Sequence, residues 1–156
     1  MSNMDDYRAF LEEVRKTTGI ESFTSDEDGL VSLNVDEKYN VNFQLVEETN
    51  KVLCFIEVCT LNKDTPKNVY RDLLVGALFG QDTAGGYFTI EPQTESLIYN
   101  YFFDLNEISN DVENFIDTIE KMLQLCDMWV ERISTTADND KKNEELINLN
   151  GIGMMS

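Results

Sequence analysis

The residues of this chain that could carry chemistry are three cysteines, a short acidic run and one glycine-rich segment, and the chain contains no histidine. Histidine is the commonest general base and the commonest transition-metal ligand, so its absence removes both kinds of site together. A serine or cysteine nucleophile would need another activating base, and no known motif supplies one. We therefore expect no enzyme activity, no catalytic residue and no cofactor.

The three cysteines are Cys54, Cys59 and Cys126, an odd number with no CxxC pair. Cys54 and Cys59 lie five residues apart in an apparent strand, which predicts that their side chains point to opposite faces. A disulfide framework or a metal site is therefore not expected, and a reducing cytoplasm fits best.

Two segments resemble ligand-binding loops only in part. The run from Asp26 to Gly29 is acidic, but the position that should hold a bidentate glutamate, six residues after Gly29, is Val35. A calcium loop is therefore excluded. The glycine-rich segment 79–86 lacks a lysine and follows a helix instead of preceding one, so it is interpreted as a helix-to-strand connection and not a phosphate loop.

The charge is strongly one-sided, with 12 Lys plus Arg against 30 Asp plus Glu and a net charge of -18. Such a chain repels phosphate backbones and anionic lipid, so we expect no nucleic-acid partner and no membrane insertion. The acidity favours either a solvated, self-repelling surface or a basic partner. There is no apolar run of about 18 residues and no signal-peptide pattern at the N-terminus, which predicts a cytoplasmic protein.

The hydrophobic periodicity predicts an α+β protein with the order helix-strand-strand-strand-helix-strand-strand-helix, a twisted antiparallel sheet with helices packed on it. We expect a single domain over 1–134 and a disordered acidic and polar tail over 135–156. The expected elements are helices at 4–17, 66–79 and 110–134, the last capped by Ser109 or Asn110, and strands at 31–35, 41–45, 52–61, 86–91 and 97–105.

Side-chain alternation also constrains the first hairpin and the third strand. A turn over residues 37–39 keeps the apolar rows of the first two strands on one face and pairs Leu33 with Phe43. The third strand is apolar on both faces, so this chain's own helices, a second copy or a partner must cover it. Its second apolar face comprises Leu53, Phe55, Cys59 and Leu61.

The segment from Tyr70 to Ile90 contains a leucine-rich helix end, a glycine-containing turn and the start of a strand. With the order of elements over about residues 4–134, it resembles the centre of the Tir-chaperone (CesT) family, the class I chaperones of bacterial type III secretion. Ala77 stands where that family usually has an asparagine. This departure leaves open a same-fold regulatory or adaptor protein outside secretion, as in YbjN-like proteins.

The resemblance implies a non-enzymatic chaperone that binds the extended N-terminal segment of a secreted effector and keeps it soluble. An extended segment can add a strand to a sheet edge and press apolar anchors into hydrophobic patches. Our candidate partner-binding residues are Leu53, Phe55 and Leu61 on the third strand, with Leu30 and Val46 nearby.

The resemblance also implies a homodimer formed through the second helix and the neighbouring strands. Small and branched residues on one face of that helix would allow close approach. The alternative is that the same face packs on its own sheet. Our candidate dimer-interface residues are Val69, Leu73, Gly76 and Ala77.

Overall fold

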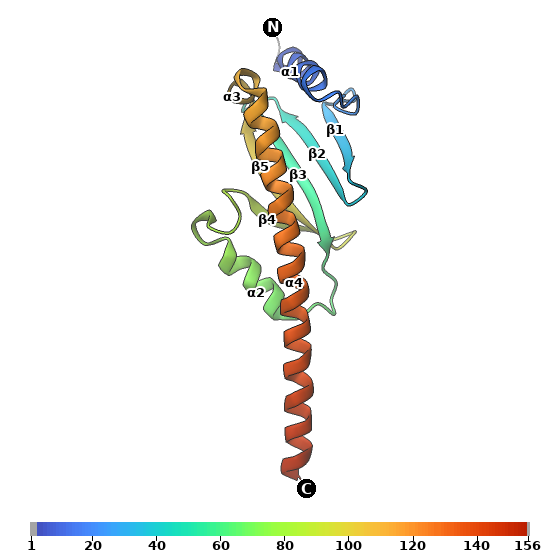
Figure 1. The fold of residues 1–156 in the computed structure, drawn as a ribbon, viewed down its shortest axis with the longest axis vertical. Coiled ribbons are helices and arrows are strands. Elements are labelled where there is room, and N and C mark those ends of the chain that lie inside the picture. The colour runs from blue at the N-terminus through green and yellow to red at the C-terminus, as the bar shows by residue number, and fades with distance from the viewer. Residues whose placement is uncertain (1–2, 156) are drawn as a thin grey trace.

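The protein is built on a five-stranded antiparallel sheet with strand order β1-β2-β3-β5-β4 (Figure 1). The computed structural model describes residues 3–155. The predicted α+β class and order of elements are confirmed, with one short helix, α3, added before the last one. The elements are α1 (Asn3–Thr18), β1 (Leu30–Val35), β2 (Tyr39–Val46), β3 (Lys51–Thr60), α2 (Lys67–Gly76), the 3₁₀ turn η1 (Leu78–Gly80), β4 (Tyr87–Glu91), β5 (Ser96–Asp104), α3 (Leu105–Asn110) and α4 (Val112–Met155).

The helices α1 and α4 cover one face of the sheet, and α4 runs along its length (Figure 1). Alternate residues of each strand are buried on this side, as period-two alternation requires. At one end, four phenylalanines from α1, β2, β5 and α4 meet with ring centroids 5.0–5.7 Å apart: Phe10, Phe43, Phe103 and Phe115. Burial of each contributes about 1.5–3 kcal/mol to folding, so this cluster fixes α1 and α4 on the sheet.

The β1–β2 hairpin differs from its predicted register by two residues. Leu33 lies opposite Val41 and not opposite Phe43, so the predicted pairing is wrong. The turn closes earlier than expected because Asp36 and Glu37 both adopt left-handed φ angles, 55° and 57°. A shift of two residues leaves every side chain on its predicted face, so the apolar rows of both strands still face the helices.

β3 contains a β-bulge between Glu57 and Cys59. The extra residue reverses the alternation of side chains from that point onward. Cys59 therefore lies on the helix-covered face, opposite Leu97, and Leu61 follows it into the core at 4 % exposure. The prediction that Cys54 and Cys59 point to opposite faces is wrong, as is the assignment of Cys59 and Leu61 to the second apolar face.

The helix boundaries near the C-terminus also differ from the prediction. The carboxylate of Asp104 caps α3. α4 begins after Asp111, whose Oδ1 accepts a hydrogen bond from the backbone N–H of Asn114 at 3.0 Å. Asp111, and not the predicted Ser109 or Asn110, is therefore the residue that caps the long helix.

α4 continues from Val112 to Met155, although we expected it to end near residue 134 and to be followed by a disordered tail. The backbone is helical through residue 155, and residue 156 lies outside the described range. Past the sheet, this helix projects beyond the other elements (Figure 1). The division into a domain over 1–134 and a tail over 135–156 stays a prediction.

α2 packs against α4 through a close contact between Gly76 and Trp129. A Cβ atom at position 76 would lie 2.6 Å from both Cζ2 and Cη2 of the indole, closer than carbon atoms can approach. Trp129 is fully buried, and its ring also meets Phe88 of β4 edge to face at 5.3 Å. The absence of a side chain at Gly76 is therefore what lets α2 lie on this tryptophan.

We expect Gly76→Ala to destabilise the protein. Overpacking of a core typically costs about 1–3 kcal/mol, and the higher helix propensity of alanine offsets about 1 kcal/mol of that. The measurement is urea denaturation followed by fluorescence, since the chain has one tryptophan and it lies at this contact. Ser134→Ala, an exposed change on α4, should shift the free energy of unfolding by less than about 0.5 kcal/mol. A stabilised Gly76→Ala variant would contradict the contact.

The three thiols on the helix-covered side predict a loss of stability at alkaline pH. Burial raises the pKa of Cys54, Cys59 and Cys126 above the ordinary thiol value of 9.0, that of Cys126 to about 12. A raised folded-state pKa means that the unfolded chain loses its thiol protons first, so stability is complete below about pH 9 and falls as pH rises from there toward 12. Chemical denaturation at pH 8 and pH 10.5 measures this difference.

Removing one of these thiols should reduce the alkaline loss. We expect Cys126→Ala to lower the free energy of unfolding at pH 8 but to lose less stability between pH 8 and 10.5 than the unchanged protein. An equal alkaline loss in both proteins would assign the effect to other groups.

Candidate protein-binding surfaces

The side chains of the described residues offer surfaces for binding but no reactive centre. Within residues 3–155 no group of three or more Cys, Asp or Glu side chains is arranged to hold a metal ion. In the same range no helix is both long and apolar enough to cross a bilayer. Apolar side chains are exposed in three places, on the uncovered sheet face, beside α4 and on α2.

The uncovered sheet face brings together four of the five predicted partner-binding residues. Leu30 pairs with Gln44, Gln44 with Leu53 and Leu53 with Phe102, so these side chains form one row across four strands. Phe55 lies in the next row and Val46 at the end of β2, on the same face. Leu61, the fifth predicted residue, is buried on the other side by the β3 bulge.

The two halves of this face differ in polarity. Across β1 and β2 it carries asparagine and serine side chains that hydrogen bond to one another, as Ser32 does to Asn42 at 2.8 Å. Across β3, β5 and β4 it carries more apolar side chains, beside the hydrogen-bonded pair Asn100 and Thr89. There the rings of Tyr87 and Phe102 stack with centroids 6.3 Å apart at 42 % and 44 % exposure. We call the apolar half the open-face patch and define it by Leu53, Phe55, Tyr87 and Phe102.

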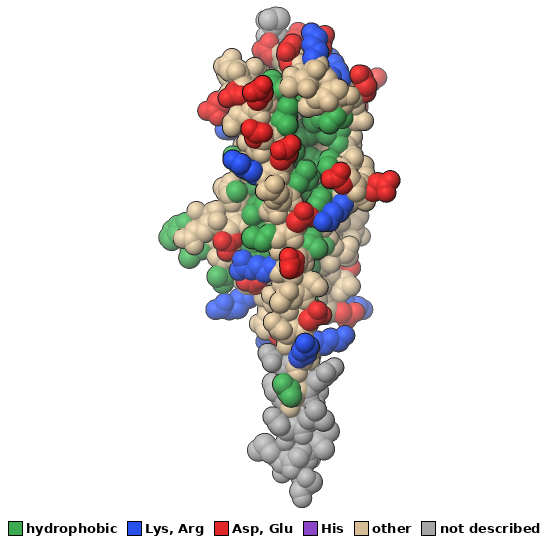
Figure 2. Space-filling model, viewed as in Figure 1, with side chains coloured by type: hydrophobic (Ala, Val, Ile, Leu, Met, Phe, Trp, Pro, Cys, Tyr) green, Lys and Arg blue, Asp and Glu red, His purple; other side chains and the backbone are tan. Residues whose placement is uncertain are grey.

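A second apolar surface is a crevice of about 180 Å³ between α4 and the β1–β2 hairpin. Figure 2 shows hydrophobic side chains gathered along this side of α4, framed by acidic and basic ones. The crevice lies beside β1, which is an edge strand of the sheet. Its apolar lining comes from the loop after α1, from the hairpin and from α4: Ile20, Phe23, Leu33, Val35, Val41, Phe115, Ile116, Ile119 and Leu123.

The third surface is the outer side of α2 and the turn that follows it. Leu74, Val75, Leu78 and Phe79 are 77 %, 53 %, 54 % and 90 % exposed. A shallow groove of about 660 Å³ lies along the same side, lined by Lys67, Asn68, Arg71, Leu74, Val75 and Leu78. We call these residues together with Phe79 the α2 surface.

The predicted dimer-interface residues lie mostly beneath this surface. Val69 and Leu73 are 0 % and 5 % exposed, and Gly76 is buried against Trp129. Ala77 is partly exposed at the end of the helix. The face of small and branched residues therefore packs within this chain, the alternative that the sequence left open.

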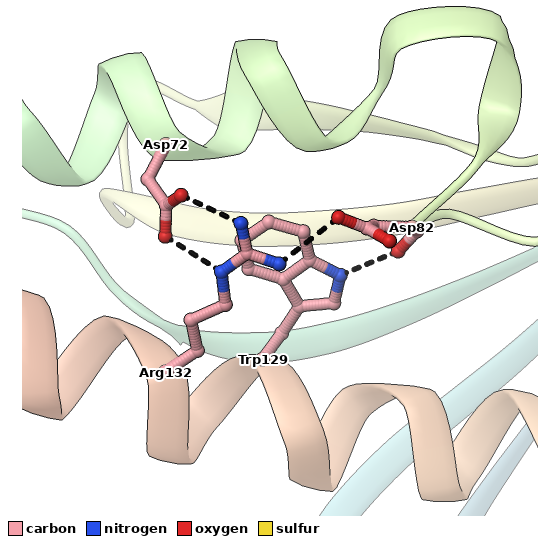
Figure 3. A network of polar contacts seen from close by, with 4 residues as sticks. All are labelled: Asp72, Asp82, Trp129 and Arg132. Carbon is pink, nitrogen blue, oxygen red and sulfur yellow. Dashed lines mark hydrogen bonds and ion pairs between the residues drawn. The ribbon is translucent and has the colours of Figure 1, made fainter.

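A network of polar contacts fixes α2 and the following loop to α4 (Figure 3). The guanidinium of Arg132 donates two hydrogen bonds to the Asp72 carboxylate, at 2.7 and 2.8 Å, and one to Asp82 Oδ2 at 3.1 Å. It lies over the Trp129 ring, 4.4 Å from the centroid, while the indole N–H donates to the Asp82 carbonyl at 2.8 Å. Bidentate arginine pairs and cation–π contacts both restrict orientation, so this network sets the angle of α2.

The α2 surface was missed in the sequence because the apolar run from Leu73 to Phe79 contains no polar residue that would set the helix phase. Which side chains turn inward depends on distant contacts, above all that of Gly76 with Trp129, 53 residues away. The crevice residues of α4 could be recognised in the sequence as part of an apolar stripe. The crevice itself could not be predicted, because it depends on how far α4 packs from the β1–β2 hairpin. The open-face patch was found in part, through Leu53 and Phe55.

Solved structures share this fold. A chain of the ExsC–ExsE complex superposes with a TM-score of 0.70 at 20 % identity, over 83 % of this chain and 94 % of that one. The Yersinia pestis type III secretion chaperone SycH in complex with a fragment of YscM2 gives a TM-score of 0.57 at 17 % identity, over 76 % of this chain and 98 % of that one. A chain of the Pseudomonas aeruginosa ExoU–SpcU complex gives a TM-score of 0.56 at 14 % identity, over 85 % of this chain and 98 % of that one.

No curated protein matches this sequence closely enough to be reported as a relative. The model of one family does match, and it spans residues 9–130, which include the sheet, α2, the α2 surface and Trp129. This stretch is most of the chain and contains every element of the fold except the start of α1 and the outer part of α4. The chain therefore belongs to the Tir chaperone protein (CesT) family and is a non-enzymatic chaperone of type III secretion.

Proposed function

We propose that this protein binds the extended N-terminal segment of a type III secreted effector in the bacterial cytoplasm and keeps that segment soluble and competent for secretion. The observation that carries the proposal is an apolar crevice directly beside an unpaired edge strand. Family membership and the secretion complexes among the structural neighbours support it.

The crevice and the strand edge can act together on an extended segment. A client strand that adds to β1 gains main-chain hydrogen bonds, and every second side chain then points toward α4. On that side Ile116, Ile119 and Leu123 recur along α4 at spacings of three and four residues. Each apolar anchor buried there contributes about 1.5–3 kcal/mol, which offsets the cost of ordering the segment.

The open-face patch offers a second set of anchors on the opposite side of the sheet. Leu53 and Phe55 are half-buried there, and Phe102 lies beside Leu53 across the strands. A segment that passes around the sheet edge would contact the crevice on one side and this patch on the other. Binding at several weak sites is what a client without a fixed fold requires.

We expect Phe55→Asp and Ile119→Asp each to reduce capture of the effector, because each puts a charge where an apolar anchor must be buried. The loss of one anchor, about 1.5–3 kcal/mol, corresponds to about a 10- to 150-fold weaker affinity. The measurement is copurification after co-expression with the secreted protein encoded beside this gene, followed by titration with its N-terminal segment.

Gln93→Asp supplies the control, since it adds the same charge at an exposed position of the β4–β5 turn, outside the crevice, the β1 edge and the open-face patch. Capture should be unchanged in this variant. Circular dichroism of all variants separates lost binding from lost folding, and unfolding of Phe55→Asp would show that Phe55 serves the core. A folded protein that captures no secreted client would favour the regulatory or adaptor alternative.

We further propose a homodimer that forms through the α2 surface. Its exposed leucines and valine form a continuous apolar strip on a helix that is otherwise anchored from below. Monomeric proteins rarely leave such a strip uncovered. The buried residues Val69, Leu73 and Gly76 would then support the interface from inside and not form it.

We expect Leu74→Asp to convert the dimer into a monomer without unfolding it, because Leu74 is 77 % exposed and contributes little to the chain's own core. Sedimentation equilibrium gives the mass of both proteins. Gln93→Asp, an exposed change in the β4–β5 turn outside the α2 surface, tests whether added charge alone is responsible and should leave the dimer intact. If Leu74→Asp stays dimeric, the dimer forms elsewhere.

A further inference from the structure

Phe79 occupies the least favourable position of any aromatic residue in the described part of the chain. Its side chain is 90 % exposed, and its backbone is left-handed, with φ 54° and ψ 20°. Left-handed geometry costs an L-residue about 1–2 kcal/mol. An exposed phenyl ring gains no hydrophobic stabilisation that would offset this cost. Among residues 3–155 the other left-handed residues are glycines or Asp36, Glu37, Asn50, Ala84 and Glu95, none of them aromatic.

The turn that carries Phe79 is held firmly and is not a loose loop. Gly80 N–H donates to the Ala77 carbonyl at 2.9 Å, and Asp82 N–H donates to the Gly76 carbonyl at 2.9 Å. Asp82 is in turn bound by Trp129 and Arg132 of α4 (Figure 3). The ring is therefore presented in a fixed position, and strain that the surroundings maintain in this way is typical of functional sites.

A groove that could receive such a ring lies on the same surface, with Leu78, the neighbour of Phe79, in its lining. It runs along the outer side of α2, and its apolar end is formed by Leu74, Val75 and Leu78. One surface that carries both a projecting ring and an apolar groove can pair with a second copy of itself about a twofold axis, since each ring then meets the partner's groove.

The charge of this surface favours the same partner. A chain of net charge -18 repels its own copies over most of its surface. α2 contains a single carboxylate, Asp72, and Arg132 binds it on the inner side of the helix. The groove is lined by Lys67 and Arg71 and by no acidic residue. Two copies therefore meet here with the least repulsion.

We propose that Phe79 is the anchor of the homodimer, with its ring seated in the α2 groove of the second copy, and that the chain keeps this strained residue at the expense of its own monomer stability. The proposal rests on the homodimer proposed above and identifies the residue that specifies it. It predicts that replacing Phe79 stabilises the folded monomer but weakens the association of two copies.

The test is Phe79→Asn, because asparagine tolerates a left-handed backbone better than other side chains do. Sedimentation should show self-association weakened at least tenfold. Melting curves at several protein concentrations give the second readout. The Tm of the unchanged protein should fall on dilution, as expected when association stabilises folding. The Tm of Phe79→Asn should depend less on protein concentration, and at high dilution it should equal or exceed that of the unchanged protein by up to about 4 °C.

Glu95→Asn is the matched control, since Glu95 has φ 57° in the β4–β5 turn, away from α2. It should relieve the same backbone strain and leave association unchanged. A dimeric Phe79→Asn with unaltered affinity would overturn the anchor while the homodimer stands. A Phe79→Asn protein that stays dimeric but loses effector capture would assign the ring to the client and overturn the proposal. An unchanged protein that is monomeric at every concentration would overturn the homodimer itself.

Discussion

The contact between Gly76 and Trp129 is the constraint on which the binding surfaces at α2 depend. The indole fills the space that any side chain at position 76 would need, and it binds the next loop through the Asp82 carbonyl. Arg132 covers the other side of the ring and ties down Asp72 and Asp82. One aromatic residue on α4 thus decides the position of α2, the direction of its exposed strip and the path of the chain into β4. Replacing a buried tryptophan by alanine typically costs about 3–5 kcal/mol, and here it would also free the whole α2 surface.

A second local feature, the bulge in β3, decides which apolar residues of the central strand face outward. Without it, the alternation that begins at Val52 would continue and Leu61 would lie on the uncovered face. With it, only Leu53 and Phe55 remain outside, and the strand's end contributes Cys59 and Leu61 to the core. The double apolar pattern that the sequence shows therefore has two origins: an exposed patch before the bulge and a change of face after it.

The sequence predicted those parts of the structure that depend on local periodicity. The order of elements, the faces of β1 and β2 and the ends of α1 follow from apolar residues spaced two, three or four apart. These spacings can be read from a short stretch of sequence, without knowledge of distant contacts. It missed what depends on distant contacts or unusual backbone. The turn at Asp36 and Glu37 shifted a register, and the phase of α2 was set by a tryptophan far along the chain. For the same reason, Leu53 and Phe55 were identified as surface candidates, whereas Leu74 and Phe79 were not.

The strong negative charge offsets a hazard that the exposed apolar surfaces create. A chaperone must leave hydrophobic residues uncovered for its client, and such surfaces would otherwise drive aggregation. A net charge of -18 opposes nonspecific approach of identical copies, because repulsion acts wherever two acidic surfaces meet. Specific association of two copies then needs a surface region that carries no acidic side chains. The outer side of α2 is such a place, because the only carboxylate of this helix, Asp72, is on the inner side and is paired there with Arg132. Selectivity for a defined partner thus comes from local removal of a general repulsion, in addition to the apolar contact itself.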